Sequence, residues 1–141
     1  MGGRTLSFAG RSPTIAALAA VALSACAPRL SAPPGPYYQK VSALVHFPDF
    51  YPGLSTLCVQ PRTLPYGPFR GYDRNGELVN TIFMVPLQDL DRHASIRTLE
   101  GTPLPVDHIE IYFNSGHPGV DMPHYHIVLW HVSTARQKTL Q

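Results

Sequence analysis

The stretch that decides the fold runs from residue 106 to residue 132 and reads VDHIEIYFNSGHPGVDMPHYHIVLWHV. It contains two apolar segments, Val106–Phe113 and His124–Val132, and residues 114–123 between them are rich in turn-forming Gly, Pro, Asn and Asp. Side chains that alternate with a period of two residues are typical of β-strands. The pattern therefore predicts two neighbouring antiparallel strands joined by a loop.

The same period sorts the side chains of the two strands onto two faces of a sheet. One face would be apolar or aromatic throughout, and we expect it to be the core: Ile109, Ile111, Phe113, Tyr125, Ile127 and Leu129. The other face would bring together four side chains that can bind a metal: His108, Glu110, His124 and His126. His131 falls on the core side, where we expect a structural histidine.

The side chains of this second face suit a divalent transition metal. Neutral imidazole nitrogens and carboxylate oxygens held on rigid strands are ligands for Zn²⁺, Cu²⁺ or Fe²⁺. The connecting loop adds His117 and Asp121, which would either complete the coordination shell or leave one position open. The alternative is a solvated structural face, on which Glu110 forms only a cross-strand ion pair. Tyr112 and Trp130 would wall a ligand pocket on this face, unless they serve only as packing.

Shorter apolar segments upstream complete a mainly β (α+β) domain. They predict four further strands: Val41–Phe47, Leu54–Gln60, Phe69–Tyr72 and Glu77–Val85. Asp73-Arg74-Asn75-Gly76 has the composition of a hairpin turn, and Pro86 introduces a short helix over Leu87–His93. We expect a compact antiparallel sheet, or a small barrel or sandwich, over residues 37–133, followed by a flexible tail over residues 134–141.

Residues 1–25 have the organisation of an export signal. Two arginines precede an apolar stretch, Thr14–Ala25, which is too short for the roughly 20 residues that a membrane-spanning helix requires. Leu23-Ser24-Ala25-Cys26 resembles the bacterial lipobox at all four positions. The resemblance implies that the signal is cut before Cys26 and that this cysteine carries acyl chains, which would hold the protein at a membrane. An ordinary secretory signal with an incidental cysteine is the alternative.

The lipobox resemblance also implies a location in the bacterial cell envelope. In lipoproteins of Gram-negative bacteria, an Ala such as Ala27 directly after the cysteine implies delivery to the outer membrane, facing the periplasm. Residues 26–36 contain four prolines, which restrict the backbone and remove hydrogen-bond donors. We expect this stretch to be an extended tether between the lipidated Cys26 and the folded domain.

Composition and missing motifs narrow the range of functions. The chain has 141 residues, a formal charge of +2 and a charged fraction of 14%, so it offers no basic surface for nucleic acid. It contains no Gly-rich phosphate loop, no Gly-x-Ser-x-Gly turn and no His-Glu-x-x-His motif, and we assign no catalytic residue. With Cys26 lipidated, Cys58 would be the one remaining thiol, and its apolar neighbours predict a small buried hydrophobic residue.

The loop and the last strand resemble a family of small uncharacterised exported bacterial proteins. Gly116-His117-Pro118-Gly119 and Pro123-His124-Tyr125-His126 correspond to that family's Gly-His-x-Pro loop and Pro-His-aromatic-Asp-x-His strand. The first histidine of each segment matches the family pattern. His126 stands where the family has Asp, and Val128 stands where it has a second strand histidine. The resemblance implies an exported domain with a polar, His-rich strand, and it carries over no activity and no complete ligand set.

Three functions stay open from the sequence. The first is a lipid-anchored envelope protein whose His-rich sheet face binds a metal ion or a small polar ligand. It is favoured because the candidate side chains are ligands without an evident nucleophile or acid–base pair. The second is a metal-dependent envelope enzyme, which requires an open coordination position in a concave pocket. The third is a structural or partner-binding lipoprotein without a metal.

Overall fold

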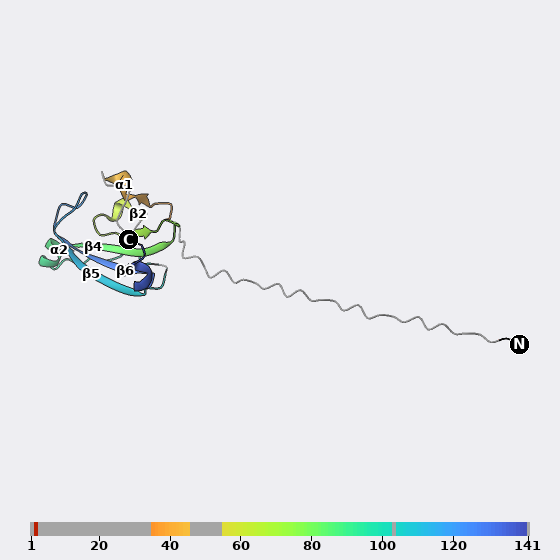
Figure 1. The fold of residues 1–141 in the computed structure, drawn as a ribbon. Helices are drawn as coiled ribbons and strands as arrows, with labels where there is room; N and C mark the ends of the chain where they lie inside the picture. Colours follow the sequence, from red (N-terminus) through yellow and green to blue (C-terminus); the bar gives the residue numbers. More distant parts are fainter. Residues whose placement is uncertain (1, 3–34, 46–54, 103, 141) are drawn as a thin grey trace.

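A six-stranded antiparallel sheet organises the described part of the chain (Figure 1). The structure is a computed structural model that describes residues 2, 35–45, 55–102 and 104–140. The strands lie in the order β1-β2-β3-β4-β6-β5. Their bounds are β1 Gln39–Lys40, β2 Thr56–Val59, β3 Phe69–Tyr72, β4 Leu78–Pro86, β5 His108–Asn114 and β6 His124–Trp130. The mainly β fold is thus confirmed, and it is an open sheet.

The N-terminal predictions lie outside the described residues. Residues 1–25 contribute only Gly2 to the structure, and Cys26 and most of the proline-rich stretch contribute nothing. Signal cleavage and lipidation therefore stay predictions. Within residues 35–45, 55–102 and 104–140, no helix is both long enough and apolar enough to span a bilayer.

Short helices connect or flank the described strands. They are α1 Val41–Leu44, the 3₁₀ helix η1 Pro61–Thr63, α2 Leu87–Asp91 and α3 Thr134–Gln137. The strand predicted from Val41 onward is wrong, because residues 41–44 form a helical turn. In a strand, Val41 and Leu44 would point to opposite faces, whereas on a helical turn both reach the same hydrophobic core. The helix predicted after Pro86 is confirmed, and it ends at Asp91 rather than His93.

The end of the chain is also more ordered than predicted. The flexible tail expected from Thr134 begins instead with α3, which Ser133 caps by accepting a hydrogen bond from the backbone of Arg136 (3.3 Å). Arg136 in turn donates to the buried carboxylate of Asp73 at 2.9 Å. The helix is therefore fastened to the β3–β4 turn, far away in the sequence.

The β3–β4 hairpin has the turn that its sequence predicts. The Asp73 carboxylate accepts hydrogen bonds from the backbone amides of Asn75 (2.8 Å) and Glu77 (3.0 Å). Gly76 has a φ of 75°, which a glycine adopts without strain. The turn fixes β4, the longest strand, between β3 and β6 at the centre of the sheet.

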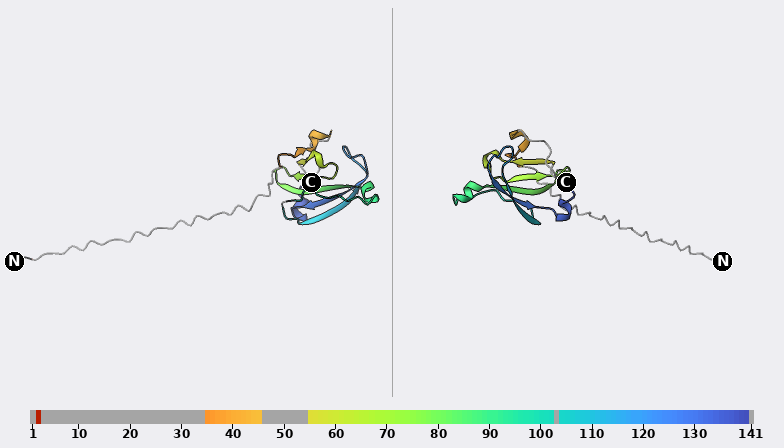
Figure 2. Two further views of the ribbon diagram at one scale, coloured as in Figure 1. Left: turned by 180° about the vertical axis from the view of Figure 1, so that it is seen from behind. Right: turned by 60° about the vertical axis from the view of Figure 1, so that its left-hand side comes forward.

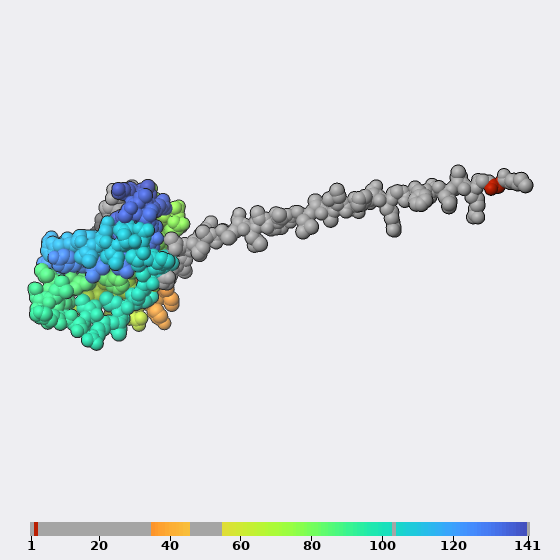
Figure 3. Space-filling view, turned by 90° about the horizontal axis from the view of Figure 1, so that it is seen from below, coloured from red at the N-terminus to blue at the C-terminus, as the bar shows by residue number. Residues whose placement is uncertain are grey.

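Burial differs strongly between the two faces of the sheet at β5 and β6. The larger hydrophobic core lies on the inner face and is formed by Val59, Phe69, Ile82, Met84 and Val128 together with Val120 of the β5–β6 loop. A second, smaller cluster is formed by Cys58, Tyr72 and Leu78. The outer face of β5 and β6 carries Ile109, Ile111, Phe113, Tyr125, Ile127 and Leu129. Ile109, Ile111 and Phe113 are 58%, 65% and 52% exposed. Figure 3 shows the cyan and blue atoms of β5 and β6 at the surface. The prediction that this outer face forms the core is wrong.

The physical reason is that β6 carries apolar side chains on both faces, so the two histidines do not by themselves mark the exposed face. Val128 belongs to one face and Ile127 to the other, and their side chains are of similar character. The loop between β5 and β6 decides the matter, because it folds back and buries Val120 against the inner face. Figures 1 and 2 show β4 in the middle, with α1 and β2 on one side of it and β5 on the opposite side.

Candidate metal centre

Three histidines converge on the inner face, at the end of β6 where the loop folds back. They are His117, His124 and His126, and one ligand atom from each lies within 4.8 Å of the others. His124 and His126 are the first and third residues of β6, so strand geometry places them on one face. Their exposed fractions are 0% and 5%, which makes this a buried cluster of imidazoles.

The β5–β6 loop brings His117 to the strand through a tight turn. The backbone groups of His117 and Val120 exchange hydrogen bonds of 3.0 and 2.9 Å. Gly116 and Gly119 on either side have φ angles of 133° and 87°, where other residues are strained. With Val120 buried, the turn holds the His117 ring edge-on to the rings of His124 and His126, at centroid distances of 4.9 and 5.5 Å.

The outer hydrogen bonds of two of these imidazoles determine which nitrogen carries the proton. Nδ1 of His124 lies 2.7 Å from the carbonyl oxygen of Met122, and Nδ1 of His117 lies 3.1 Å from that of Pro118. A carbonyl oxygen only accepts, so each Nδ1 donates a proton to it. In the neutral imidazole, Nε2 then keeps its lone pair. A backbone carbonyl behind the ring is a common arrangement for histidines that bind a metal.

His126 links the triad to β5. Its Nε2 lies 2.7 Å from Nε2 of His124, and its Nδ1 lies 2.8 Å from the hydroxyl of Tyr112. Since Nε2 of His124 is the acceptor, His126 donates through Nε2 and receives the Tyr112 hydroxyl proton at Nδ1. If His126 carries the proton on Nδ1 instead, it donates to the Tyr112 oxygen and its Nε2 lone pair faces the triad. The Tyr112 contact therefore suits both tautomers, whereas the contact between the two Nε2 atoms is a hydrogen bond only in the metal-free one.

Burial favours the uncharged form of His126. Removal from water, together with the nearby imidazoles of His124 and His117, lowers the pKa of His126 to about 4. At neutral pH the ring is therefore neutral, which is the form that binds a metal. No proton has to be removed from a charged imidazole before His126 coordinates.

The spacing of the triad is close to that of a tetrahedral metal site. Zn–N bonds of about 2.0–2.1 Å at tetrahedral angles place two ligand nitrogens about 3.3 Å apart. The Nε2 atoms of His124 and His126 are closer than this, at 2.7 Å, and the widest ligand separation in the cluster is within 4.8 Å. Small rotations of the rings would accommodate an ion. Three protein ligands would leave one position of a tetrahedral shell open.

One side of the triad borders an apolar cavity of about 60 Å³. Side chains from α1, β2, β3, β4 and the loop form its walls, among them Val41, Leu57, Phe69, Ile82, Met84 and Val120. His117, His126 and Tyr112 are the histidine and tyrosine side chains that line it. The open position of a three-histidine site would therefore face a hydrophobic space.

Comparison with known proteins supplies one informative match. No family model matches the chain, and no curated protein is significantly similar to it. The crystal structure of the hypothetical protein TTHB210 from Thermus thermophilus is 43% identical in sequence, with a TM-score of 0.59. The match covers 66% of this chain and 91% of the Thermus protein.

The chain belongs to the same family as TTHB210. This family relationship supports the open sheet described above. The word "hypothetical" attributes no activity to the Thermus protein, so membership of the TTHB210 family brings a fold without a function.

The structure brings together only some of the residues predicted for the metal site. His124, His126 and the loop residue His117 meet, whereas His108 and Glu110 do not join them. In the antiparallel register, His108 lies opposite Trp130 and Glu110 opposite Val128, while His126 lies opposite Tyr112. His108 and Glu110 thus share the face of the triad and lie further along the ladder, where Glu110 bonds to Trp130 and Gln137. The predicted convergence of His108 and Glu110 with His124 and His126 is therefore not formed.

His108 and Glu110 take part in a surface network with α3. His108 contacts the Asp107 carboxylate through Nδ1 (2.9 Å) and the Gln137 oxygen through Nε2 (3.0 Å). Glu110 accepts hydrogen bonds from Gln137 (3.0 Å) and from the indole of Trp130 (2.9 Å). The Asp107 hydrogen bond raises the pKa of His108, and the Gln137 and Trp130 hydrogen bonds lower the pKa of Glu110. These contacts order the C-terminal helix.

Of the other residues that the sequence analysis singled out, some take the predicted place in the structure and others do not. Tyr112 lines the cavity, as predicted for a pocket residue. Trp130 does not line it, because the indole bonds to Glu110 and stacks on His108. Asp121 is exposed and does not belong to the ligand cluster. Cys58 is a free, buried cysteine, and burial raises its pKa, in agreement with its predicted role as a small hydrophobic residue.

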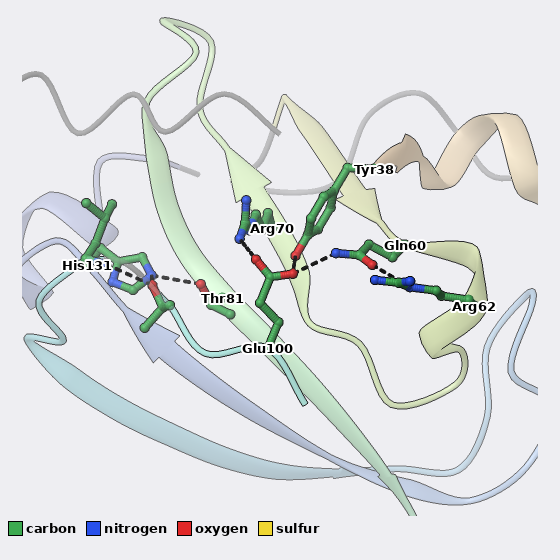
Figure 4. Close-up of polar contacts among 9 residues, drawn as sticks. Tyr38, Gln60, Arg62, Arg70, Thr81, Glu100 and His131 are labelled. Atoms are coloured by element: carbon green, nitrogen blue, oxygen red, sulfur yellow. Dashed lines mark hydrogen bonds and ion pairs between the residues drawn. The ribbon is translucent and has the colours of Figure 1, made fainter. Parts of the chain in front are cut away.

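A second polar cluster, separate from the histidine triad, surrounds the carboxylate of Glu100 (Figure 4). The Glu100 carboxylate accepts hydrogen bonds from Arg70 (2.6 Å), Gln60 (2.6 Å) and Tyr38 (3.2 Å). Arg70 also lies over the Tyr38 ring, 4.2 Å from its centroid. Both oxygens of Glu100 are thus engaged by the protein, and this cluster fastens the loop that carries Glu100 to β2 and β3. The sequence contains no local signal for it, since its members are up to 62 residues apart.

His131 is a structural histidine, as predicted. Its Nδ1 contacts the carbonyl oxygen of Pro105 at 2.9 Å, and its Nε2 contacts the hydroxyls of Thr81 (2.9 Å) and Thr102 (3.1 Å) (Figure 4). The ring is buried, and burial lowers its pKa. Because protein groups surround both nitrogens, His131 ties the loop before β5 to β4.

Proposed function

We propose that this protein binds a divalent transition metal through His117, His124 and His126. One observation carries the proposal: two buried imidazoles and the half-buried His117 converge while the Nδ1 atoms of His117 and His124 donate to carbonyl oxygens behind them. Because Nδ1 carries the proton in His117 and His124, the Nε2 lone pair of each of these rings is available to bind a metal ion in the cluster. Among the metals considered from the sequence, Zn²⁺ fits best, because it accepts three imidazoles in a tetrahedral site.

The experiment is a metal-binding measurement on the chain from Ala27 onward, which lacks the signal and the lipidated cysteine. After dialysis against Zn²⁺, elemental analysis should give one zinc per chain. The double variant His124→Ala and His126→Ala should bind none. His108→Ala is the matched control, because it removes a histidine of the same sheet face outside the triad, and it should keep the zinc. Equal loss in the control, or zinc retained by the double variant, would contradict the proposal.

We further propose that the protein is anchored in the bacterial cell envelope by lipid on Cys26. The support is the lipobox-like segment Leu23–Cys26 and the proline-rich stretch that follows it. Growth with labelled palmitate should label the wild-type protein, and Cys26→Ser should abolish both the label and membrane fractionation. Label that persists in Cys26→Ser would contradict lipidation at this residue.

A metal-dependent enzyme is the second candidate function. It is favoured by one specific observation, the position of the triad at the wall of a cavity, where an open coordination site could receive a substrate. The described site contains no further acid or nucleophile in the ligand cluster, so the metal-bound water would be the reactive group.

A further inference from the structure

The cavity beside the triad has the character of a binding site for an apolar group. Its walls come from α1, from the five strands β2 to β6 and from the β5–β6 loop, and they are mainly aliphatic. The histidine and tyrosine side chains gather at the triad. A ligand that fills this space therefore needs an apolar body and one polar end directed at His117 and His126.

The volume sets the size of that ligand. About 60 Å³ is well below the roughly 150 Å³ of an apolar cavity that holds benzene, so the walls surround only a few ligand atoms. This suits the first carbons of a short aliphatic chain next to one functional group. The further carbons of a fatty acid of eight or more carbons would extend beyond these walls.

Charge sets the nature of the polar end. This step rests on the proposed metal site. Three neutral imidazoles around a divalent ion leave a charge of about +2, which is costly in a buried place unless an anion compensates it. The ligand cluster contains no carboxylate, and Asp121, the acidic residue of the loop, is exposed. A carboxylate from outside the chain can compensate this charge as the fourth ligand, in place of a metal-bound water or hydroxide.

We propose that the cavity binds a short-chain aliphatic monocarboxylate, with its carboxylate on the metal held by His117, His124 and His126. The first carbons of the tail lie among Val41, Leu57 and the core side chains next to them. The metal and the cavity then select the ligand jointly: the ion recognises the head and the apolar walls bind the part of the tail next to it.

The test uses the Co²⁺-loaded chain from Ala27 onward, because the visible spectrum of Co²⁺ reports a change of ligand. Butyrate should produce a saturable spectral change. Acetate shares the head and lacks two carbons of the tail, and it should bind about tenfold more weakly, from the loss of two buried carbon groups. Octanoate should bind no more tightly than butyrate, because its further carbons lie beyond the cavity walls. Equal affinity for acetate and butyrate overturns the proposal.

A cavity-filling variant provides an independent readout. Val41→Phe enlarges a half-buried wall residue of α1 and should reduce butyrate affinity at least tenfold while one Co²⁺ stays bound. Leu90→Phe is the matched control, because Leu90 is 49% exposed on α2 and lies outside the cavity lining. Unchanged butyrate binding in Val41→Phe with intact metal overturns the cavity proposal alone. A wild-type chain that binds no metal overturns the proposed function, and the carboxylate proposal with it.

Discussion

A comparison of the two faces of the sheet at strands β4, β6 and β5 shows what determines burial in this protein. The outer face is apolar, yet Ile109, Ile111 and Phe113 are each more than half exposed. The inner face carries His124 and His126, and both are buried. Composition alone would predict that the apolar outer face is buried and that the inner face, which carries the histidines, is exposed. The difference arises from what lies over each face: α1 and the β5–β6 loop cover the inner face, and the loop adds Val120 to the core.

The largest effect expected from this comparison is on stability. Met84→Ala on the inner face should lower the free energy of unfolding by about 3 kcal/mol, since it leaves a cavity in a packed core. Ile111→Ala on the outer face should cost less than about 1 kcal/mol, because the side chain is 65% exposed. Urea unfolding of the two variants measures both values. A cost for Ile111→Ala equal to that for Met84→Ala would mean that something covers the outer face.

The second prediction tests whether the β5–β6 loop, which covers the inner face, is required for the metal centre. A Cβ at Gly119 would lie 2.8 Å from Cγ1 of Val45, so Gly119→Ala should displace the turn that holds His117. We expect metal affinity to fall at least tenfold and stability to fall by about 2 kcal/mol. Gly76→Ala is the control: its φ of 75° gives comparable backbone strain, and no atom lies within 4 Å of the added carbon. Metal titration should show unchanged affinity in that control.

A third prediction compares one tyrosine from each face. Tyr112→Phe removes the hydroxyl that contacts Nδ1 of His126, and we expect about a tenfold loss of zinc affinity, as is usual for a residue that orients a ligand. Tyr125→Phe alters the outer face and should leave zinc affinity unchanged. Competition titration with a zinc chelator measures both. Equal effects of the two substitutions would remove Tyr112 from the site.

A fourth prediction is the pH dependence of the metal-free protein. His126 has a folded-state pKa of about 4, below the ordinary value of 6.5. The unfolded chain therefore binds the proton more readily, and stability must fall as the pH drops from about 6.5 to about 4. The expected loss over this pH range is about 3 kcal/mol, and His131, whose pKa is also lowered, acts in the same direction. His126→Asn should show a shallower fall in thermal unfolding. An identical pH profile in the variant would contradict the assignment.

The sequence predicted local structure well where a local rule applies. The Asp73–Gly76 turn, the strand Phe69–Tyr72 and the helix after Pro86 depend on turn residues and proline geometry, and all were confirmed. The helical turn over Val41–Leu44 was missed, because a four-residue apolar segment fits a strand or a helix and only the core contacts decide.

The candidate site was predicted in part for a related reason. Strand alternation correctly placed His124 and His126 together, and the loop supplied His117. Alternation assigns a face and says nothing of position along the ladder. The antiparallel register then separates His108 and Glu110 from the triad, by placing Tyr112 and Asn114 opposite His126 and His124. Which face is buried also depended on the fold of the loop, which no local pattern of residues 114–123 indicates.

The most direct test of the metal centre is X-ray absorption spectroscopy at the zinc edge of the chain from Ala27 onward, loaded with one equivalent of Zn²⁺. The three-histidine site predicts three imidazole nitrogens at about 2.0–2.1 Å and one further light-atom ligand. A spectrum with sulfur at about 2.3 Å, which would implicate Cys58, or with oxygen ligands and no imidazole scattering, would contradict it.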